Sequence, residues 1–396
     1  MLHQVDANAD DDGRLYDPGL IAFVLLAVGP LSIAFSVIAP LLGPIAAQLG
    51  GEAAAQQIVV APLAGFAVGG VLGGWIIAAL GVRSTILAAT VIYILTGASG
   101  LYAQSAGVLQ LNAFLLGVAS VVIVAAAGVV LADRYRGNAR ARLIGYQTAS
   151  GSLLNAVAVF LSGVIAEAVG WRMSFLLFVG LGLVVLVVAA LYVPKIAKAP
   201  KSESRAGFAA YTPLIPIFVA VAAYLLVTTN TVTHTSLLLA DVGLKSTTIA
   251  ATIISLQGLS AMAAGFFYGR MTASVGRLAV LGGGVAVCAV GFILPGVFHN
   301  VYALGAGTLA LGLSIGMVVP FLTERLMGMA SDQIRPQALG YFLTAQFVGG
   351  FFNPFLIGPV RMALGLHGMY VATGVFTGIV GLAAVAVLAS RKPAVA

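Results

Sequence analysis

The sequence predicts an all-α membrane protein with twelve transmembrane helices in two pseudo-symmetric six-helix bundles. Of its 396 residues, 61% are hydrophobic and only 8% are charged, against about 25% charged residues in soluble domains. Apolar runs of about 20 residues or more recur along the chain, and basic residues gather in alternate loops. These observations exclude a soluble fold, and a repeat of half the chain length indicates the two bundles.

Each apolar run is long enough to cross a hydrocarbon core of about 30 Å as a helix. In chain order, the predicted helices cover residues 19–46, 57–80, 84–105, 108–132, 143–169, 172–194, 213–240, 247–273, 277–298, 300–329, 336–364 and 368–391. The longest polar interruption, 195–212, is rich in Lys, Ser and Pro and predicts a cytoplasmic linker. The expected parts are therefore a tail (1–18), an N-terminal bundle (19–194), the linker, and a C-terminal bundle (213–396).

The charged residues predict the orientation in the membrane. Residues 1–18 hold five aspartates and no apolar core, so we expect a disordered acidic tail and no cleaved signal. With both termini cytoplasmic, sixteen Lys and Arg residues fall on the inner side and only three, Arg172, Lys245 and Arg361, on the outer side. This bias predicts a multi-pass protein of the cell inner membrane. Because topology explains the net charge of +7, the expected partner is the lipid bilayer and not nucleic acid.

Glycines recur at an offset of 195 residues, close to half the chain length. The pairs fall at equivalent helix ends and packing positions: Gly70/Gly265, Gly74/Gly269, Gly81/Gly276, Gly117/Gly312, Gly145/Gly340, Gly163/Gly358 and Gly170/Gly365. Glycine at such positions lets membrane helices approach closely or turn tightly. The pattern predicts six helices duplicated in parallel.

Three local motifs lie in register with this repeat. The loop after the second predicted helix reads Gly74-Trp-Ile-Ile-Ala-Ala-Leu-Gly81-Val-Arg83, and the second half repeats it from Gly269 to Gly276 and Arg277. The fifth helix ends in a small-residue pair followed by Gly-Trp-Arg, from Ser162 to Arg172. Here the sequence resembles the major facilitator superfamily over nearly its whole length. The resemblance implies two six-helix bundles that rock around a central cavity, in general character like short twelve-helix bacterial efflux members.

The chain departs from this family in its loop motif. Ala78 and Ala79 stand where the family carries an acid and a neighbouring base, so the cytoplasmic charge network must be altered. The remaining gating candidates are Gly74, Gly81, Arg83, Gly269, Gly276, Arg277, Glu324 and Arg325. The alternative is that the charged residues of this set are solvated loop charges that only set topology. The proline of the family's antiporter signature is missing from the fifth helix, so the motifs do not support drug/proton antiport.

Polar residues inside the spans mark the expected cavity. The seventh helix carries Thr228-Thr-Asn-Thr-Val-Thr-His-Thr-Ser236, where Asn230 and His234 share a face at a spacing of four, beside Thr231 and Thr235. The resemblance implies that the first, fourth, seventh and tenth helices line the cavity. Further candidates are Ser32, Ser36, Asn112 and Gln346. His234 is the proton-coupling candidate, because imidazole titrates near neutral pH. The alternative is that these polar residues only join neighbouring helices.

No catalytic, metal or cofactor motif stands out, and the chain is expected not to be an enzyme. Gly97-Ala-Ser99-Gly100 matches a short intramembrane protease motif, but a four-letter match is expected by chance in a chain this rich in small residues. The favoured function is a monomeric secondary transporter that exports a small organic molecule by alternating access, with protons as a candidate coupling ion. One alternative is uptake or facilitated transport of a small polar or anionic metabolite. Another is a non-transporting membrane scaffold on the same fold.

Overall fold

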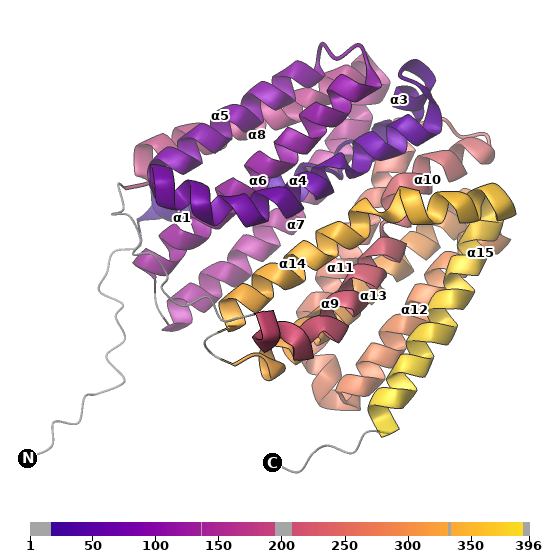
Figure 1. Ribbon diagram of the computed structural model, residues 1–396. Helices are drawn as coiled ribbons and strands as arrows, with labels where there is room; N and C mark the ends of the chain where they lie inside the picture. The colour runs from indigo at the N-terminus through magenta and orange to yellow at the C-terminus, as the bar shows by residue number, and fades with distance from the viewer. Residues whose placement is uncertain (1–16, 136, 195–207, 332–333, 391–396) are drawn as a thin grey trace, which may run out of the picture.

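All secondary structure described in the computed structural model is helical (Figure 1). The structure describes residues 17–135, 137–194, 208–331 and 334–390. Its elements are α1 (Pro18–Leu26), α2 (Gly29–Ile33), η1 (Ala39–Leu41), α3 (Leu42–Gln48), α4 (Gly51–Leu80), α5 (Val82–Gly100), α6 (Ala106–Arg134), α7 (Gly137–Val169), η2 (Trp171–Phe175), α8 (Leu176–Tyr192), η3 (Phe208–Leu214), α9 (Ile215–Thr228), α10 (Asn230–Asp241), α11 (Thr247–Val275), α12 (Arg277–Val297), α13 (Val301–Met329), α14 (Arg335–Phe351) and α15 (Asn353–Ser390).

Ten segments of the described residues are long and apolar enough to cross a membrane. The last of them, Gln337–Ser390, runs for 54 residues and passes through Gly365, whose φ of 71° and ψ of 177° are not helical. Gly365 lies between the predicted helices 336–364 and 368–391. The predicted helix 19–46 is not continuous but is divided into α1, α2, η1 and α3. Pro30 and Pro40 lie at the starts of the second and third pieces, where a missing backbone donor is tolerated.

Two further predicted helices are interrupted near their middles. The predicted helix 213–240 is divided at Thr229 into α9 and α10, and 336–364 is divided at Phe352 into α14 and α15. The second break precedes Asn353-Pro354, since a proline cannot donate to the turn before it. The predicted tail (1–18) and linker (195–212) lie largely outside the described residues. The last part of the predicted linker contributes to η3 and is helical.

Local geometry recurs at the predicted offset of 195 residues. Gly81 and Gly276 both have positive φ, 81° and 86°, at the turns that join α4 to α5 and α11 to α12. A Cβ on Gly117 would lie 2.3 Å from the Pro62 carbonyl oxygen, and one on Gly312 would lie 2.2 Å from that of Gln257. The α4–α6 and α11–α13 crossings therefore use equivalent glycines, which allow the helix backbones to touch.

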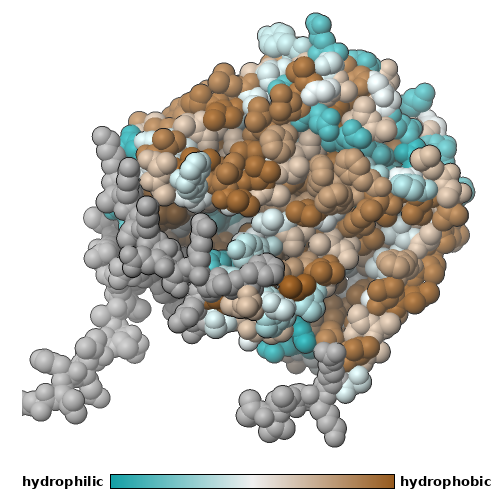
Figure 2. All heavy atoms as spheres, in the orientation of Figure 1, coloured by the Kyte–Doolittle hydropathy of each residue, from teal (hydrophilic) through white to brown (hydrophobic). Residues whose placement is uncertain are grey.

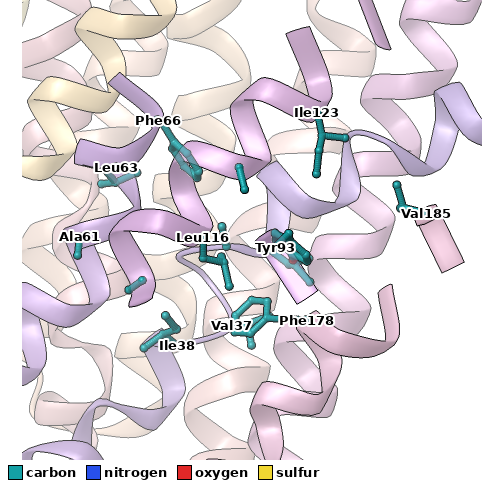
Figure 3. Packing of buried hydrophobic residues seen from close by; sticks show 14 of the residues in the cluster. Val37, Ile38, Ala61, Leu63, Phe66, Tyr93, Leu116, Ile123, Phe178 and Val185 are labelled. Carbon is teal, nitrogen blue, oxygen red and sulfur yellow. The ribbon is translucent and has the colours of Figure 1, made fainter. Parts of the chain in front are cut away.

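The buried apolar side chains form two clusters. One is drawn mainly from residues 20–193, and its Tyr93 and Phe178 rings meet edge to face at 6.1 Å (Figure 3). The other comes from residues 211–370. We refer to residues 18–194 as the N-terminal part and to residues 208–390 as the C-terminal part. Hydrophobic residues cover much of the outer surface (Figure 2), as expected of a surface that faces lipid.

The start of α1 and the end of α15 lie at one end of the molecule, the terminal end (Figure 1). The opposite end, where α3, the start of α4 and the end of α10 lie, is the far end. Hydrophilic residues gather over the far end at the upper right of Figure 2. Because neighbouring helices alternate in direction, residues near 52, 241 and 361 share the far end, and those near 83, 277 and 324 share the terminal end.

Candidate functional site

The break between α9 and α10 places a group of polar side chains inside the C-terminal part. Asn230, Thr231, His234 and Thr235 are all buried, with at most 2% of each residue exposed. Upstream, the hydroxyls of Thr228 and Thr229 donate to carbonyl oxygens four residues earlier on α9. Such side-chain bonds compete with the helix ladder and favour a bend at this point.

Asn353, at the break between α14 and α15, lies at the centre of this group. Its Nδ2 donates to the Leu226 carbonyl oxygen at 2.7 Å and to Asn230 Oδ1 at 2.8 Å. Its Oδ1 accepts from Thr233 Oγ1 at 3.0 Å. The hydroxyl of Tyr370 donates to the Asn230 carbonyl oxygen at 3.2 Å. We call the group made of Asn353, Leu226, Asn230, Thr233, Tyr370 and His234 the junction network. It joins α9, α10 and α15.

His234 is held within the junction network. Its Nδ1 lies 2.8 Å from Thr233 Oγ1, and its ring meets Tyr370 edge to face at 6.4 Å. Two donors beside it, Asn230 Nδ2 and Thr231 Oγ1, have no hydrogen-bond partner among the described residues. Buried donors without partners cost free energy. These two atoms are therefore the groups in the cluster that could bind a polar ligand.

The remaining predicted cavity residues fall outside this network. Ser36 donates to the side-chain oxygen of Asn155 on α7 and to the Ser32 carbonyl oxygen. Ser32 in turn donates to Val28, so the two serines form a second group in the N-terminal part. Asn112 and Gln346 are partly buried, and in the described part of the chain no hydrogen bond links either to the two groups. Of the eight predicted residues, Asn230 and His234 belong to the junction network. Thr231 and Thr235 lie beside them on α10, and Ser32 and Ser36 form the separate group.

The predicted gating residues lie at the terminal end. Arg83 donates to the Ala190 carbonyl oxygen at 2.8 Å within the N-terminal part. Arg277 pairs with Glu324 at 2.7 Å within the C-terminal part, where Tyr268 also donates to Glu324. Arg325 is exposed. A Cβ on Gly74 or Gly269 would meet nothing within 4 Å, so these glycines leave room at the helix surface.

Most polar contacts between the two parts lie at the far end, while one, from Ser255 Oγ to the Ala156 carbonyl oxygen at 3.2 Å, lies deeper along α7 and α11. Thr247 Oγ1 donates to the Gly163 carbonyl oxygen at 2.8 Å, and Ser236 Oγ donates to that of Ala39 at 3.2 Å. Arg361 forms an ion pair with Glu52. A carboxylate oxygen of Glu167 accepts from Ser246 Oγ at 2.7 Å and from the Thr248 backbone at 3.0 Å.

Sequence reasoning did not select Asn353, Tyr370 or the Glu52–Arg361 pair as site residues. A signal for Asn353 was present, since Asn-Pro inside a span often marks a break. The other contacts join residues more than 100 positions apart, as Tyr370 joins Asn230 and Arg361 joins Glu52.

Comparisons with known proteins agree with this architecture. A sequence model of the Major Facilitator Superfamily matches residues 24–240, more than half of the chain. The chain belongs to the major facilitator superfamily. No curated protein matches the sequence.

Solved transporters share the fold of this superfamily member. A structure of the nucleoside transporter NupG has a TM-score of 0.75 at 14% identity and covers 94% of this chain and 100% of its own. A peptide transporter POT mutant has a TM-score of 0.78 at 12% identity, covering 93% and 94%. The POT family transporter PepTSo has a TM-score of 0.73 at 13% identity, covering 95% and 99%. The likeness extends over both parts of the chain and concerns the fold alone.

Proposed function

We propose that this protein is a secondary transporter of the inner membrane that exports a small, weakly charged or amphipathic organic molecule by alternating access. Its two parts correspond to two six-helix bundles, and the terminal end faces the cytoplasm. The charge asymmetry of the loops supports this orientation. The far end, with Arg361 and Lys245, then faces outwards.

The observation that carries the proposal is the distribution of contacts between the two parts. Four sets of polar contacts join them at the far end. At the terminal end, the side chains of Tyr146 on α7 and Tyr341 on α14 are exposed, and the bonds of Arg83 and Arg277 stay within one part. This is the pattern expected of a transporter closed to the outside, ready to take substrate from the cytoplasm.

The far-end contacts are weak enough to be exchanged in a transport cycle. The side chains of Glu52 and Arg361 are 48% and 25% exposed, and ion pairs that water reaches contribute about 0–1 kcal/mol. Rocking of the two parts would separate these contacts. In the same movement the α9–α10 break can turn the junction network toward the cavity, where Asn230 and Thr231 offer donors and His234 a titratable group.

The neutral character of the junction network supports a weakly charged substrate. Its polar groups are amides, hydroxyls and one imidazole, whereas Arg83, Arg277, Glu324 and Arg361 lie toward the two ends of the molecule. An amide or a hydroxyl can bind a polar group of the substrate without the desolvation cost that a fixed charge would add. The group formed by Ser32, Ser36 and Asn155 offers similar chemistry on the N-terminal part.

The test is proton flux in proteoliposomes that hold a pH-sensitive dye, with pooled candidate substrates applied as a gradient. Wild type should move protons when its substrate moves, and His234→Asn should lose this coupling. Thr235→Val, a matched change one residue away, should keep the proton-to-substrate ratio. Substrate movement without protons, unchanged in His234→Asn, would mean a uniporter or another driving ion and would leave His234 a packing role.

A further inference from the structure

A second titratable group lies at the far end of the C-terminal part, outside the junction network. His367 on α15 has Nε2 at 2.7 Å from Asp241 Oδ2 on α10, and Nδ1 at 3.0 Å from the Pro295 carbonyl oxygen on α12. Its side chain is 19% exposed, and that of Asp241 is 56% exposed. One imidazole therefore connects three helices at a position that water can reach.

The two hydrogen-bond partners of His367, Asp241 and the Pro295 carbonyl, determine how many protons its ring must carry. A carboxylate and a carbonyl oxygen are both acceptors, so both ring nitrogens must carry a proton for both hydrogen bonds to form. Neutral imidazole has only one N–H, and would leave one nitrogen lone pair facing an oxygen. Both hydrogen bonds can therefore form only with the imidazolium. Loss of the proton removes one of the two bonds by which His367 joins α15 to α10 and α12.

His299 adds a second constraint. Its ring stacks on His367 at 3.7 Å with an interplanar angle of 25°, and its Nε2 lies 3.3 Å from the Gly296 carbonyl oxygen. Two charged rings at this distance would repel each other. Of the two rings, only His367 faces a carboxylate among the described residues, so a positive charge on the stacked pair is best placed there.

A cavity lies beside the Asp241–His367 pair, since Asp241 lines it. It has a volume of about 840 Å³ and is lined from α4, α10 and α15, including Asp241, Glu52, Arg361, Gly365 and Leu366. In the described part of the chain, the charged groups that line this cavity are Asp241, Glu52 and Arg361, and His299 stacks on His367. Because Glu52 pairs with Arg361, Asp241 is the acid available to the imidazolium.

We propose that His367 is a proton-binding site whose occupation holds the far end closed. Protonated His367 fixes the end of α10 against α12 and α15. This keeps Ser236 of α10 in place against Ala39 of the N-terminal part. Loss of the proton frees α10 to move away with the opening far end. By linkage, a proton that binds the closed state more tightly also makes closure depend on pH. The inference rests on the proposed outward orientation of the far end, and not on His234.

The experiment measures far-end distances without any substrate. Spin labels are placed at Ala47→Cys on α3 and Lys245→Cys after α10, both exposed positions, in full-length protein carrying Cys288→Ala in nanodiscs. Distances are recorded across about pH 5 to 8.5, which brackets the ordinary titration of histidine. Wild type should show a short, narrow distance at low pH and a longer population as pH rises.

The variants assign the transition. His367→Gln should abolish its pH dependence. Asp241→Asn, which keeps His367 but removes its carboxylate partner, should weaken the closure that wild type shows at low pH. Asp133→Asn, which removes one acid at the other end of the molecule, should leave the midpoint unchanged. Gel filtration at each pH confirms that the variants are folded.

Several outcomes would overturn the proposal. These are distances that do not change with pH in wild type, a transition that survives in His367→Gln, or one that is lost in His234→Asn instead. A pH transition that depends on His367 in a protein without detectable transport would sustain this inference while removing the proposed function. Transport coupled through His234, with far-end distances that do not change with pH, would sustain the proposed function and overturn this inference.

Discussion

At the scale of single residues, Asn353 satisfies three polar groups at two helix breaks. Its amide nitrogen donates to the carbonyl oxygen of Leu226, which the break between α9 and α10 leaves without its usual helical donor. The same side chain also forms hydrogen bonds with the side chains of Asn230 and Thr233. The side chains of Asn353, Asn230 and Thr233 are fully buried. A buried polar group left without a partner costs about 1–3 kcal/mol, so one side chain stabilises both breaks.

Replacing Asn353 should therefore destabilise the protein more than replacing another amide in the spans. Asn353→Leu keeps a similar volume but leaves Asn230 Oδ1 and the Leu226 carbonyl oxygen unpaired, and we expect a loss of about 2 kcal/mol in the free energy of unfolding. Gln346→Leu, at a partly buried amide with no hydrogen bond among the described residues, is the control and should change stability by less than about 0.5 kcal/mol. Unfolding in detergent followed by tryptophan fluorescence measures both, and equal effects would contradict the role given to Asn353.

The sequence could identify the polar residues of this site but not their partners. The spacing of Asn230 and His234 on one helix follows from local geometry. Their bonds to α15 depend on how a segment more than 100 positions away packs against them. The same holds for His367, which stands far from the other histidines in the sequence and bonds to Asp241 and Pro295 on other helices. Short-range patterns carry no information about such contacts.

At the scale of helices, glycine determines how closely neighbouring spans approach. Apolar side chains gain little by leaving lipid for another helix, so membrane helices associate mainly through close packing. On α13, a Cβ at Gly312 would lie 1.9 Å from Ser260 Oγ and 2.2 Å from the Gln257 carbonyl oxygen of α11. Gly117 has the equivalent contact between α6 and α4. The backbone carbonyls cannot rotate away as a side chain could.

Adding one methyl group at these crossings should separate the helices. We expect Gly312→Ala and Gly117→Ala each to destabilise the protein by about 1–3 kcal/mol, the usual cost of overpacking. Gly269→Ala and Gly74→Ala, another pair at the 195-residue offset, are controls with no atom within 4 Å of the added carbon. The yield of monodisperse protein and its midpoint of thermal unfolding give the comparison. If all four variants behaved alike, the glycine pairs would reflect ancestry without a packing role.

Hydrophobicity predicted where spans lie better than where they break. Length and hydropathy identify long apolar helices such as α6, α11 and α13 close to their predicted positions. They could not distinguish a continuous helix from one divided at Thr229 or Phe352, because both fit the same apolar run. Nor could they predict the division of the first predicted span into four pieces, at two of which Pro30 and Pro40 lie near the start.

At the scale of the whole molecule, the two ends differ in what they connect. Glu52 and Arg361 join the N-terminal part to the C-terminal part at the far end. Arg172 and Gln48, 2.8 Å apart at the same end, both belong to the N-terminal part. If the two parts rock as rigid bodies, only the first pair must separate during transport. The two pairs therefore distinguish movement between the parts from flexibility of the far end itself.

Cross-linking Glu52→Cys to Arg361→Cys should stop transport. The only native cysteine, Cys288, is buried and is replaced by alanine in all variants. A bifunctional thiol reagent that spans the length of the ion pair would hold the far end closed, so substrate flux in proteoliposomes should fall to the level of empty vesicles and return after reduction. The same reagent on Gln48→Cys with Arg172→Cys should leave flux unchanged, because both residues move together. Continued transport by fully cross-linked Glu52→Cys, Arg361→Cys protein would rule out opening at the far end as a required step, and with it alternating access between the two parts.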